Sequence, residues 1–378
     1  MHAGLPVVTA IETGGDLAPM DAAIDALPNR PAVFALWPDA GEPYLSKTAV
    51  LRRRLLRLLG AREKPSRLLN LRHTVRRIDY QLTGSAFESG VLLYELTRRY
   101  FPDSYLKRLN LRLPPYVNIA LSNQFPRSRI TTHLTRGPEL FFGPFRSRAS
   151  AERFEGQFLD LFQMRRCQED LDPSPGHPGC IYGEMGMCVR PCQLVVGPAE
   201  YRHEVARVVD FLRTGGRSLL EAIAHSRDRL SEEMMFEEAA RQHKRFEKVQ
   251  ETLKLRDELA RDVGRLNGVA ITRSPAANAV ELWFIRDGGW LGARRLDLEV
   301  HEGKPVSLDQ KLRETIAAVE ARAITSGERR EYLALLARWF YSTWRDGEWL
   351  AFESYGEIPY RKLVNAVSRV AHGETRAE

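Results

Sequence analysis

Four cysteines lie within 26 residues of one another in a chain of 378 residues, which contains no other cysteine. They are Cys167, Cys180, Cys188 and Cys192. Four thiolates in one compact loop region can close a tetrahedral zinc site or hold a four-iron cluster. The segment between the first two is rich in Gly and Pro (DPSPGHPG, 172–179), so its backbone can turn around a bulky centre. The spacing therefore predicts a metal centre.

The chemistry of thiols admits either zinc or an iron–sulfur cluster. Zinc sites favour two close pairs of cysteines, and here only the last pair is close. The plainer alternative is four buried cysteines without a metal. Disulfides are not expected, because the N-terminus lacks the basic and apolar regions of a secretion signal and the longest apolar runs are too short to span a membrane. A cytoplasmic location, where thiols stay reduced, is the expectation.

A second group of residues is strongly basic. Between Arg52 and Arg77 there are ten Lys or Arg residues and one acid, Glu63, in a chain of net charge +7. Such a one-sided run suits a phosphate backbone, although a solvated helix face would look the same. An RNA-binding protein would add stacking aromatic residues, and none occurs between residues 48 and 79. We predict that duplex DNA contacts Arg52, Arg53, Arg57, Arg62, Lys64, Arg67, Arg72, Arg76 and Arg77.

The elements that must position these residues begin with a small α/β unit. Hydrophobic patterning predicts strands at 31–36 and 42–47 and helices at 48–59 and 85–100. Thr48 is the expected N-cap of the first helix, which ends at Gly60. Ser85 and Glu88 form the sequence pattern of a capping box at the start of the second helix.

The rest of the chain predicts further strands and long helices. Strands are expected at 114–122 and 127–134, helices at 149–164 and 198–214, a helical hairpin within 218–263, three strands within 268–300, and helices at 307–323 and 328–343. The aromatic stretch 337–352 is interpreted as the core of a helical cap. Together these elements predict an α+β multidomain protein.

The cysteine region also resembles a known family. MRRCQED (164–170) and CIYGEMGMCVRPC (180–192) are similar to the four-cysteine region of UvrC, the incision subunit of the bacterial excinuclease. LFFGPFRSRASAERF (140–154) resembles a segment and the following helix of the same family, and the likeness covers residues 30–300. The resemblance implies that all four cysteines ligate an iron–sulfur cluster, 4Fe–4S in type, with zinc as the alternative.

The stretch MMFEEAARQHKRFEKVQ (234–250) resembles the UVR motif, a helical hairpin through which UvrC binds UvrB. The motif's core is kept at Phe236, Glu237, Ala239 and Ala240. By resemblance these residues bind a UvrB-like partner, with Phe236 as the large anchor. An acid of the family motif is replaced by Lys244, so the polarity of the usual contact differs.

The N-terminal unit is similar to a GIY-YIG nuclease domain but departs from it at two positions of the catalytic site, and Ser46 replaces a glycine of the family. PAVF (31–34) puts Phe34 where that domain has its first tyrosine, whereas YLSK (44–47) keeps Tyr44 and Lys47, and the next helix keeps Arg54. The metal-binding glutamate corresponds to Leu93. Tyr44, Lys47 and Arg54 are therefore the implied catalytic remnant, and we expect all five residues around one concave site.

The two departures make metal-dependent cleavage doubtful, because leucine cannot bind Mg²⁺ or Mn²⁺ and phenylalanine cannot exchange a proton. Glu95 lies roughly 200° from Leu93 around a helix, and Glu88 lies more than a turn away. A replacement role for either carboxylate remains an alternative. The sequence therefore leaves open whether the protein is an enzyme.

By resemblance, the chain divides into a GIY-YIG-like domain (1–105), linker strands with the four-cysteine module (106–200), a helical region with the UVR motif (201–263) and an α+β C-terminal part (264–378). The family's RNase H-type nuclease and helix-hairpin-helix unit are not expected, although the strands at 268–300 resemble the lead-in to that nuclease. Residues 301–378 match nothing that we can assign.

The resemblance implies a UvrC-like component of nucleotide excision repair, within the SOS response, which incises damaged DNA beside a UvrB-like protein. The competing hypothesis is an adaptor that binds DNA and that partner without cutting. A metal-binding carboxylate at position 93 would favour the enzyme, and its absence favours the adaptor.

Overall fold

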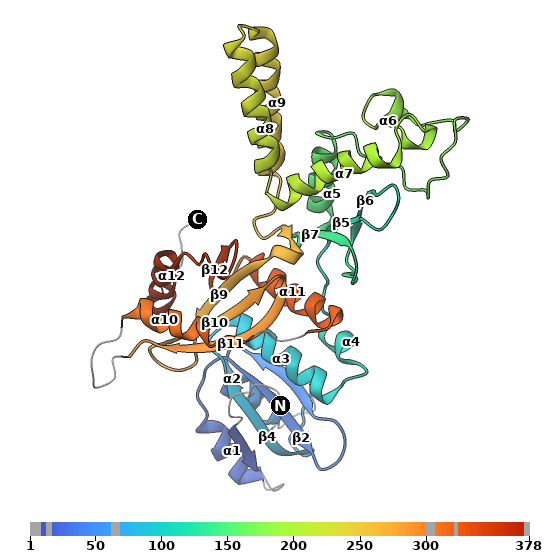
Figure 1. The fold of residues 1–378 in the computed structure, drawn as a ribbon. Coiled ribbons are helices and arrows are strands. Elements are labelled where there is room, and N and C mark those ends of the chain that lie inside the picture. The colour runs from blue at the N-terminus through green and yellow to red at the C-terminus, as the bar shows by residue number, and fades with distance from the viewer. Residues whose placement is uncertain (1–8, 13–16, 62–68, 300–306, 321–323, 374–378) are drawn as a thin grey trace.

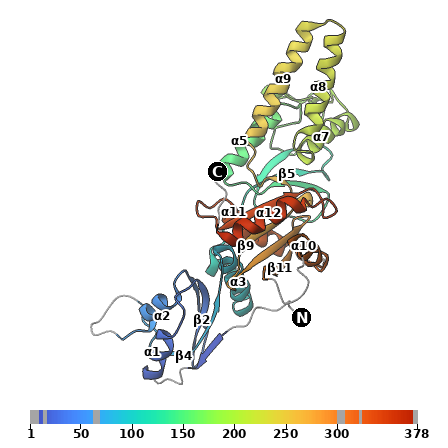
Figure 2. The same ribbon diagram turned by 90° about the vertical axis from the view of Figure 1, so that its left-hand side faces the viewer.

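The computed structural model describes residues 9–12, 17–61, 69–299, 307–320 and 324–373. In these residues the chain forms three antiparallel four-stranded sheets and their covering helices, which confirms a mixed α+β protein. The sheets lie one after another along an elongated molecule, with a helical hairpin at one end and the N-terminal sheet at the other (Figures 1 and 2). No helix in the described ranges is long and apolar enough to cross a membrane.

The N-terminal sheet has the strand order β1-β4-β2-β3. Its strands are β1 (Thr9–Glu12), β2 (Ala32–Pro38), β3 (Tyr44–Thr48) and β4 (Val75–Leu82), and its helices are α1 (Leu17–Asp25), α2 (Leu51–Leu59) and α3 (Ala86–Tyr100). Side chains alternate along β2, so Phe34 faces the core formed with α1 and α2. Val33 faces the other way and packs against Leu92 and Leu96 of α3. One face of the sheet thus packs against α1 and α2, and the other packs against α3.

The middle sheet has the order β6-β5-β7-β8. It consists of β5 (Tyr116–Ala120), β6 (Ser128–Thr131), β7 (Glu139–Gly143) and β8 (Arg261–Asp262), with α4 (Tyr105–Leu109) before it and α5 (Arg148–Leu159), α6 (Ile181–Glu184) and α7 (Pro198–Arg213) following β7. Its core is aromatic: Phe154 is fully buried and stacks on Phe142 with ring centroids 5.5 Å apart. Because β8 follows the hairpin, the chain leaves this module and returns to complete its sheet.

The predicted helical hairpin is present as α8 (Arg217–Glu232) and α9 (Phe236–Lys254). Leu219, Ile223 and Val249, near its base, belong to the core of the middle module. The two helices then extend away from the body, side by side, in both views (Figures 1 and 2).

The C-terminal sheet has the order β11-β10-β9-β12. Its elements are β9 (Asn267–Arg273), β10 (Ala279–Arg286), β11 (Gly289–Asp297), α10 (Leu308–Ala317), α11 (Ser326–Phe340), β12 (Gly347–Phe352) and α12 (Tyr360–His372). Helices α10 and α12 pack on one face of the sheet. Helix α11 covers the other face together with α3 of the N-terminal unit.

Helix α3 is therefore shared between two sheets. Its Phe87 packs against Trp283 and Trp339, and its Tyr94 donates a hydrogen bond of 2.6 Å to Glu331 of α11. These contacts join residues far apart in the sequence through one buried aromatic core.

Three local predictions need correction. The stretch 337–352 is not a helical cap, because α11 ends at Phe340 and 347–352 forms β12, which pairs with β9. Thr48 is the last residue of β3, and α2 starts three residues later with Val50 as its N-cap. Ser85 does cap α3, but the Glu88 carboxylate accepts from the backbone N–H of Gly84 rather than from Ser85.

Candidate functional site

Three of the five remnant positions lie together on the α2 side of the N-terminal sheet. Phe34 is buried, and its ring centroid is 6.3 Å from that of Tyr44. The Arg54 guanidinium on α2 donates a hydrogen bond of 3.2 Å to the Tyr44 hydroxyl. Arg54 Nε is buried without a hydrogen-bond partner among the described residues. A phenol and a guanidinium are thus held in contact, with phenylalanine beside them.

Lys47 and Leu93 lie on the opposite side of the same sheet. Lys47 pairs with Val33, and directly opposite residues of antiparallel strands point to one face, which here is the α3 face. Leu93 of α3 packs on that face, and it lines a cavity of about 180 Å³ with Lys47 and with Arg338 of α11. The structure therefore does not bring the five residues to one concave site, because Lys47 and Leu93 are separated from the other three by the sheet.

The two carboxylates considered as replacement ligands have other partners. Glu95 accepts a hydrogen bond of 3.1 Å from the Tyr332 hydroxyl. Glu88 is buried and accepts from the Gly84 N–H at 2.7 Å. The pKa of Glu88 is raised to about 7, mainly by burial and also by nearby Glu281, against the opposing effect of the Gly84 hydrogen bond. Among the described residues, neither carboxylate forms a hydrogen bond or an ion pair with Tyr44 or Arg54.

The four cysteines are all on loops and short helical turns that follow α5. Cys180 is the N-cap of α6, Cys192 lies in a single 3-10 turn (Pro191–Gln193), and Cys188 accepts a 3.4 Å hydrogen bond from the Arg190 N–H. All four are free thiols, and Cys188 and Cys192 are buried. The pKa of Cys188 is raised to about 11, mainly by burial, and the other three thiols are near enough to contribute to the rise. The cysteines are therefore neighbours in space.

The donor set is chemically suited to zinc or to an iron–sulfur cluster, which both take thiolate ligands. However, the four thiols do not converge on one point as the ligands of a metal would. Across the described ranges, no three His, Cys, Asp or Glu residues are arranged so that they could hold a metal ion. The four cysteines have the chemistry of metal ligands and lie near one another, but in this structure they are not arranged in a ligand geometry.

The basic segment is only partly a free surface. Arg62, Lys64 and Arg67 lie outside the described residues. Arg53 and Arg57 of α2 are exposed, and Arg52 donates to the Leu27 carbonyl at 2.7 Å. The remaining three arginines are in β4 or just before it.

Arg72 corrects the prediction, because it is buried and donates to both oxygens of Asp21 and to the Leu59 carbonyl. Arg76 is paired with Asp39 at 3.0 Å and Arg77 with Asp79 at 2.7 Å. Arg72 therefore holds the fold together and is not positioned to contact DNA.

The UVR-like residues lie at the outer end of the hairpin. Phe236 is 66% exposed and stands beside the exposed Met234 and Met235. Ala239 is buried in the hairpin, whereas Glu237 and Ala240 are exposed. An apolar tip of three large side chains in water is typical of a protein-binding surface.

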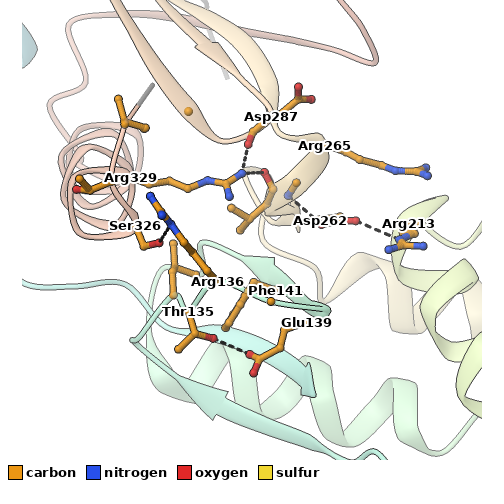
Figure 3. Close-up of a pocket in the computed structure, with 17 residues that line it drawn as sticks. Thr135, Arg136, Glu139, Phe141, Arg213, Asp262, Arg265, Asp287, Ser326 and Arg329 are labelled. Atoms are coloured by element: carbon orange, nitrogen blue, oxygen red, sulfur yellow. Dashed lines mark hydrogen bonds and ion pairs between the residues drawn. The ribbon is translucent and has the colours of Figure 1, made fainter. Parts of the chain in front are cut away.

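One cavity was not predicted from the sequence. It has a volume of about 680 Å³ and lies where the middle and C-terminal sheets meet (Figure 3). Arg136 donates to the Ser326 hydroxyl, Arg213 is paired with Asp262, and Arg329 donates to backbone carbonyls of the opposite wall. These cations already have partners, and no sequence pattern links residues so far apart.

Comparison with known proteins finds sequence similarity over much of the chain. Residues 115–211 match the family described as UvrC/Cho excinuclease, middle domain. The chain is 26% identical to UvrABC system protein C of Lachnospira eligens over 282 residues, which are 73% of this chain and 46% of that protein. The same protein of Moorella thermoacetica is 27% identical over 278 residues, with 73% and 45% covered.

The chain thus spans about half the length of the curated relatives that it matches. No solved structure is significantly similar to it. The matched residues 115–211 contain three strands of the middle sheet, helix α5, most of α7 and all four cysteines. Residues 115–211 are therefore similar in sequence to the UvrC/Cho excinuclease middle domain, and about three quarters of the chain is similar to UvrABC system protein C.

Proposed function

We propose that this protein is a UvrC-like component of nucleotide excision repair that acts as a non-catalytic adaptor, binding DNA and a UvrB-like protein. The similarity to UvrABC system protein C supports the process. The adaptor role rests on one observation: the remnant nuclease residues are split between the two faces of the N-terminal sheet, with leucine at the position of the metal ligand.

Phosphodiester cleavage by a nuclease of this kind uses a divalent metal to stabilise the charge on the scissile phosphate. The Tyr44–Arg54 pair can bind a phosphate, but it has no carboxylate contact for a metal among the described residues. The loss of metal-based stabilisation is worth several kcal/mol, which corresponds to orders of magnitude in rate. A protein that binds DNA without cutting it is what this chemistry predicts.

The test is nicking of UV-irradiated supercoiled plasmid in Mn²⁺, with a UvrB-type protein loaded. We expect no metal-dependent nicking by the native protein. The variants Leu93→Glu and Leu93→Glu/Phe34→Tyr should also be inactive, since a carboxylate at position 93 would lie across the sheet from Arg54. Metal-dependent nicking by the native protein that Arg54→Ala abolishes would overturn the adaptor role.

Partner binding is assigned to the tip of the hairpin. Phe236 is the largest exposed apolar residue there, and large aromatic anchors dominate small interfaces. Phe236→Ser should weaken binding to a UvrB-type protein by about 2 kcal/mol or more, measured by calorimetry. Leu106→Ser is a matched control, because Leu106 is also exposed but lies on α4. Equal loss of binding in both variants would reject the assignment.

The four cysteines are proposed to ligate an iron–sulfur cluster, with zinc as the alternative. The support is the thiol donor set and the closeness of the other three thiols to Cys188. A bound cluster would supply a covalent crosslink between loops that have little regular structure. Protein purified without oxygen should be brown and lose its visible absorption in Cys188→Ser. Colourless protein with one zinc per chain would support the alternative, and metal-free protein would reject both.

A further inference from the structure

The small cavity beside Lys47 is formed by two parts of the chain that are almost 300 residues apart. Lys47 and Leu93 line it from the N-terminal unit, and Arg338, Trp339 and Trp344 line it from α11 and the loop that follows. Its volume is about 180 Å³. Sites for whole drug-sized ligands occupy roughly 300–1,000 Å³, so this cavity fits only part of a larger molecule.

The cavity contains two cations that lack an anionic partner. The side-chain cations of Lys47 and Arg338 make no hydrogen bond or ion pair with any residue in the described ranges, and both residues are exposed. Arg108, also in the wall, differs because it is paired with Glu42 at 2.5 Å. Placing two unpaired cations beside one cavity costs free energy, and an anion between them would remove that cost.

Asp346 is an acidic residue near the cavity, and both of its carboxylate oxygens already accept hydrogen bonds. One oxygen of Asp346 accepts from the Trp339 indole N–H at 2.9 Å, and the other accepts from the Ala86 N–H at the start of α3. Asp346 therefore anchors the loop between α11 and β12 to the N-terminal unit. Its negative charge partly offsets the unfavourable effect of Arg338 on the Lys47 cation, and among the described residues it makes no hydrogen bond to either side chain.

Trp344 projects from this anchored loop into solvent. It is 57% exposed, whereas Trp339, in the same wall, is 3% exposed. An exposed indole on a fixed loop beside two free cations combines the two contacts that single-stranded nucleic acids use, which are base stacking and phosphate neutralisation.

We propose that this cavity binds one nucleotide of a single DNA strand, with a phosphate between Lys47 and Arg338 and the base stacked on Trp344. The proposal rests on the DNA-binding role proposed above, and it adds a site from the C-terminal part. An acidic peptide would satisfy the cations but would leave Trp344 unused. A duplex would keep its bases stacked on one another and out of reach of the indole.

The experiment is a fluorescence titration of the full chain with a single-stranded thymidine octamer. Stacking should quench the Trp344 emission. Trp344→Phe should retain most of the affinity, measured by anisotropy of a labelled octamer, and lose the quenching. Trp344→Ala should weaken binding about tenfold, since stacking on one aromatic residue is worth roughly 1–3 kcal/mol.

The cations are tested by salt dependence. Each phosphate contact to a single strand contributes roughly 0.7 to the slope of log affinity against log salt. Lys47→Gln/Arg338→Gln removes the contact to one phosphate and should therefore lower the slope by about 0.7. Arg153→Gln, at an exposed arginine of α5, should leave the slope unchanged. Unaltered affinity in Trp344→Ala, or stronger binding of a polyglutamate peptide than of the octamer, would overturn the proposal.

Duplex binding separates this inference from the proposed function. If the native protein binds duplex DNA but the octamer causes no quenching, the cavity proposal fails and the adaptor role stands. If it binds neither, both fail. Urea unfolding of each variant confirms that it is folded, and the exposed positions of Lys47, Arg338 and Trp344 predict little change.

Discussion

Replacing Glu88 by glutamine is expected to stabilise the protein at pH 8 and to change little at pH 4. Glu88 is 5% exposed, in the first turn of α3, where it meets the C-terminal sheet. Its pKa is raised to about 7, mainly by burial; Glu281 and Asp346 contribute to the rise, while the Gly84 N–H and Arg295 oppose it. The charged carboxylate is therefore disfavoured in the folded protein.

The sign and size follow from linkage. A carboxyl group whose pKa is higher in the folded than in the unfolded protein contributes stability below its ordinary pKa of 4.5, and that contribution is lost as the pH rises to about 7. Each pKa step of one is worth about 1.4 kcal/mol, so the loss between pH 4.5 and pH 7 is roughly 3 kcal/mol. Glutamine keeps a carbonyl for the Gly84 N–H and carries no charge.

The assay is urea unfolding at pH 4, 6 and 8, followed by tryptophan fluorescence, because Trp283 and Trp339 pack against Phe87 near this site. The free energy of unfolding of Glu88→Gln minus that of the native protein should rise by about 3 kcal/mol from pH 4 to pH 8. Glu237→Gln, at the exposed hairpin tip, is the control and should give a flat difference. A flat difference for Glu88→Gln as well would refute the reasoning.

Further substitutions test the packing and the corrected DNA surface. Tyr94→Phe removes the 2.6 Å hydrogen bond to buried Glu331 and should cost roughly 1–3 kcal/mol in urea unfolding; no change would contradict the shared role of α3. Phe154→Ala empties the centre of the middle core and should cost roughly 3–5 kcal/mol by the same measurement, and a cost below 1 kcal/mol would contradict the packing. Arg53→Gln should lower the salt slope of duplex binding by about 0.9, whereas Arg72→Gln should lower stability and leave the slope unchanged; the opposite result would restore Arg72 to the DNA surface.

The long helices and three of the four strands of the C-terminal sheet were predictable because their patterns repeat over many residues. The hairpin, α7 and the strands β9 to β11 lie where hydrophobic periodicity placed them. Strand β12 was missed because GEWLAF (347–352) gains its strand identity from pairing with β9, about 80 residues earlier. Strand β4 was not predicted, because its adjacent arginines interrupt the alternation of apolar and polar residues. Val75 and Ile78 nevertheless mark its buried face.

The site was predicted in part, and one error could have been avoided. Tyr44 and Lys47 are three positions apart on a single strand, so their side chains must point to opposite faces. That parity rule separates Lys47 from the Tyr44–Arg54 pair without any structure. The cavity shared by Lys47 and Arg338 was beyond prediction, because only the docking of α11 against α3 brings the two together.

The hairpin has a consequence for the distance at which a partner is held. Its base is fixed by Leu219, Ile223 and Val249 in the middle core, and its outer half adds no residue to that core within the described ranges. The length of the hairpin between its base and its apolar tip is therefore not constrained by packing against the rest of the protein. Seven residues added to each helix would advance Phe236 by about 10 Å while keeping nearly the same face toward the partner. Hairpin length thus sets the gap between the partner and the DNA surface separately from the affinity of either contact.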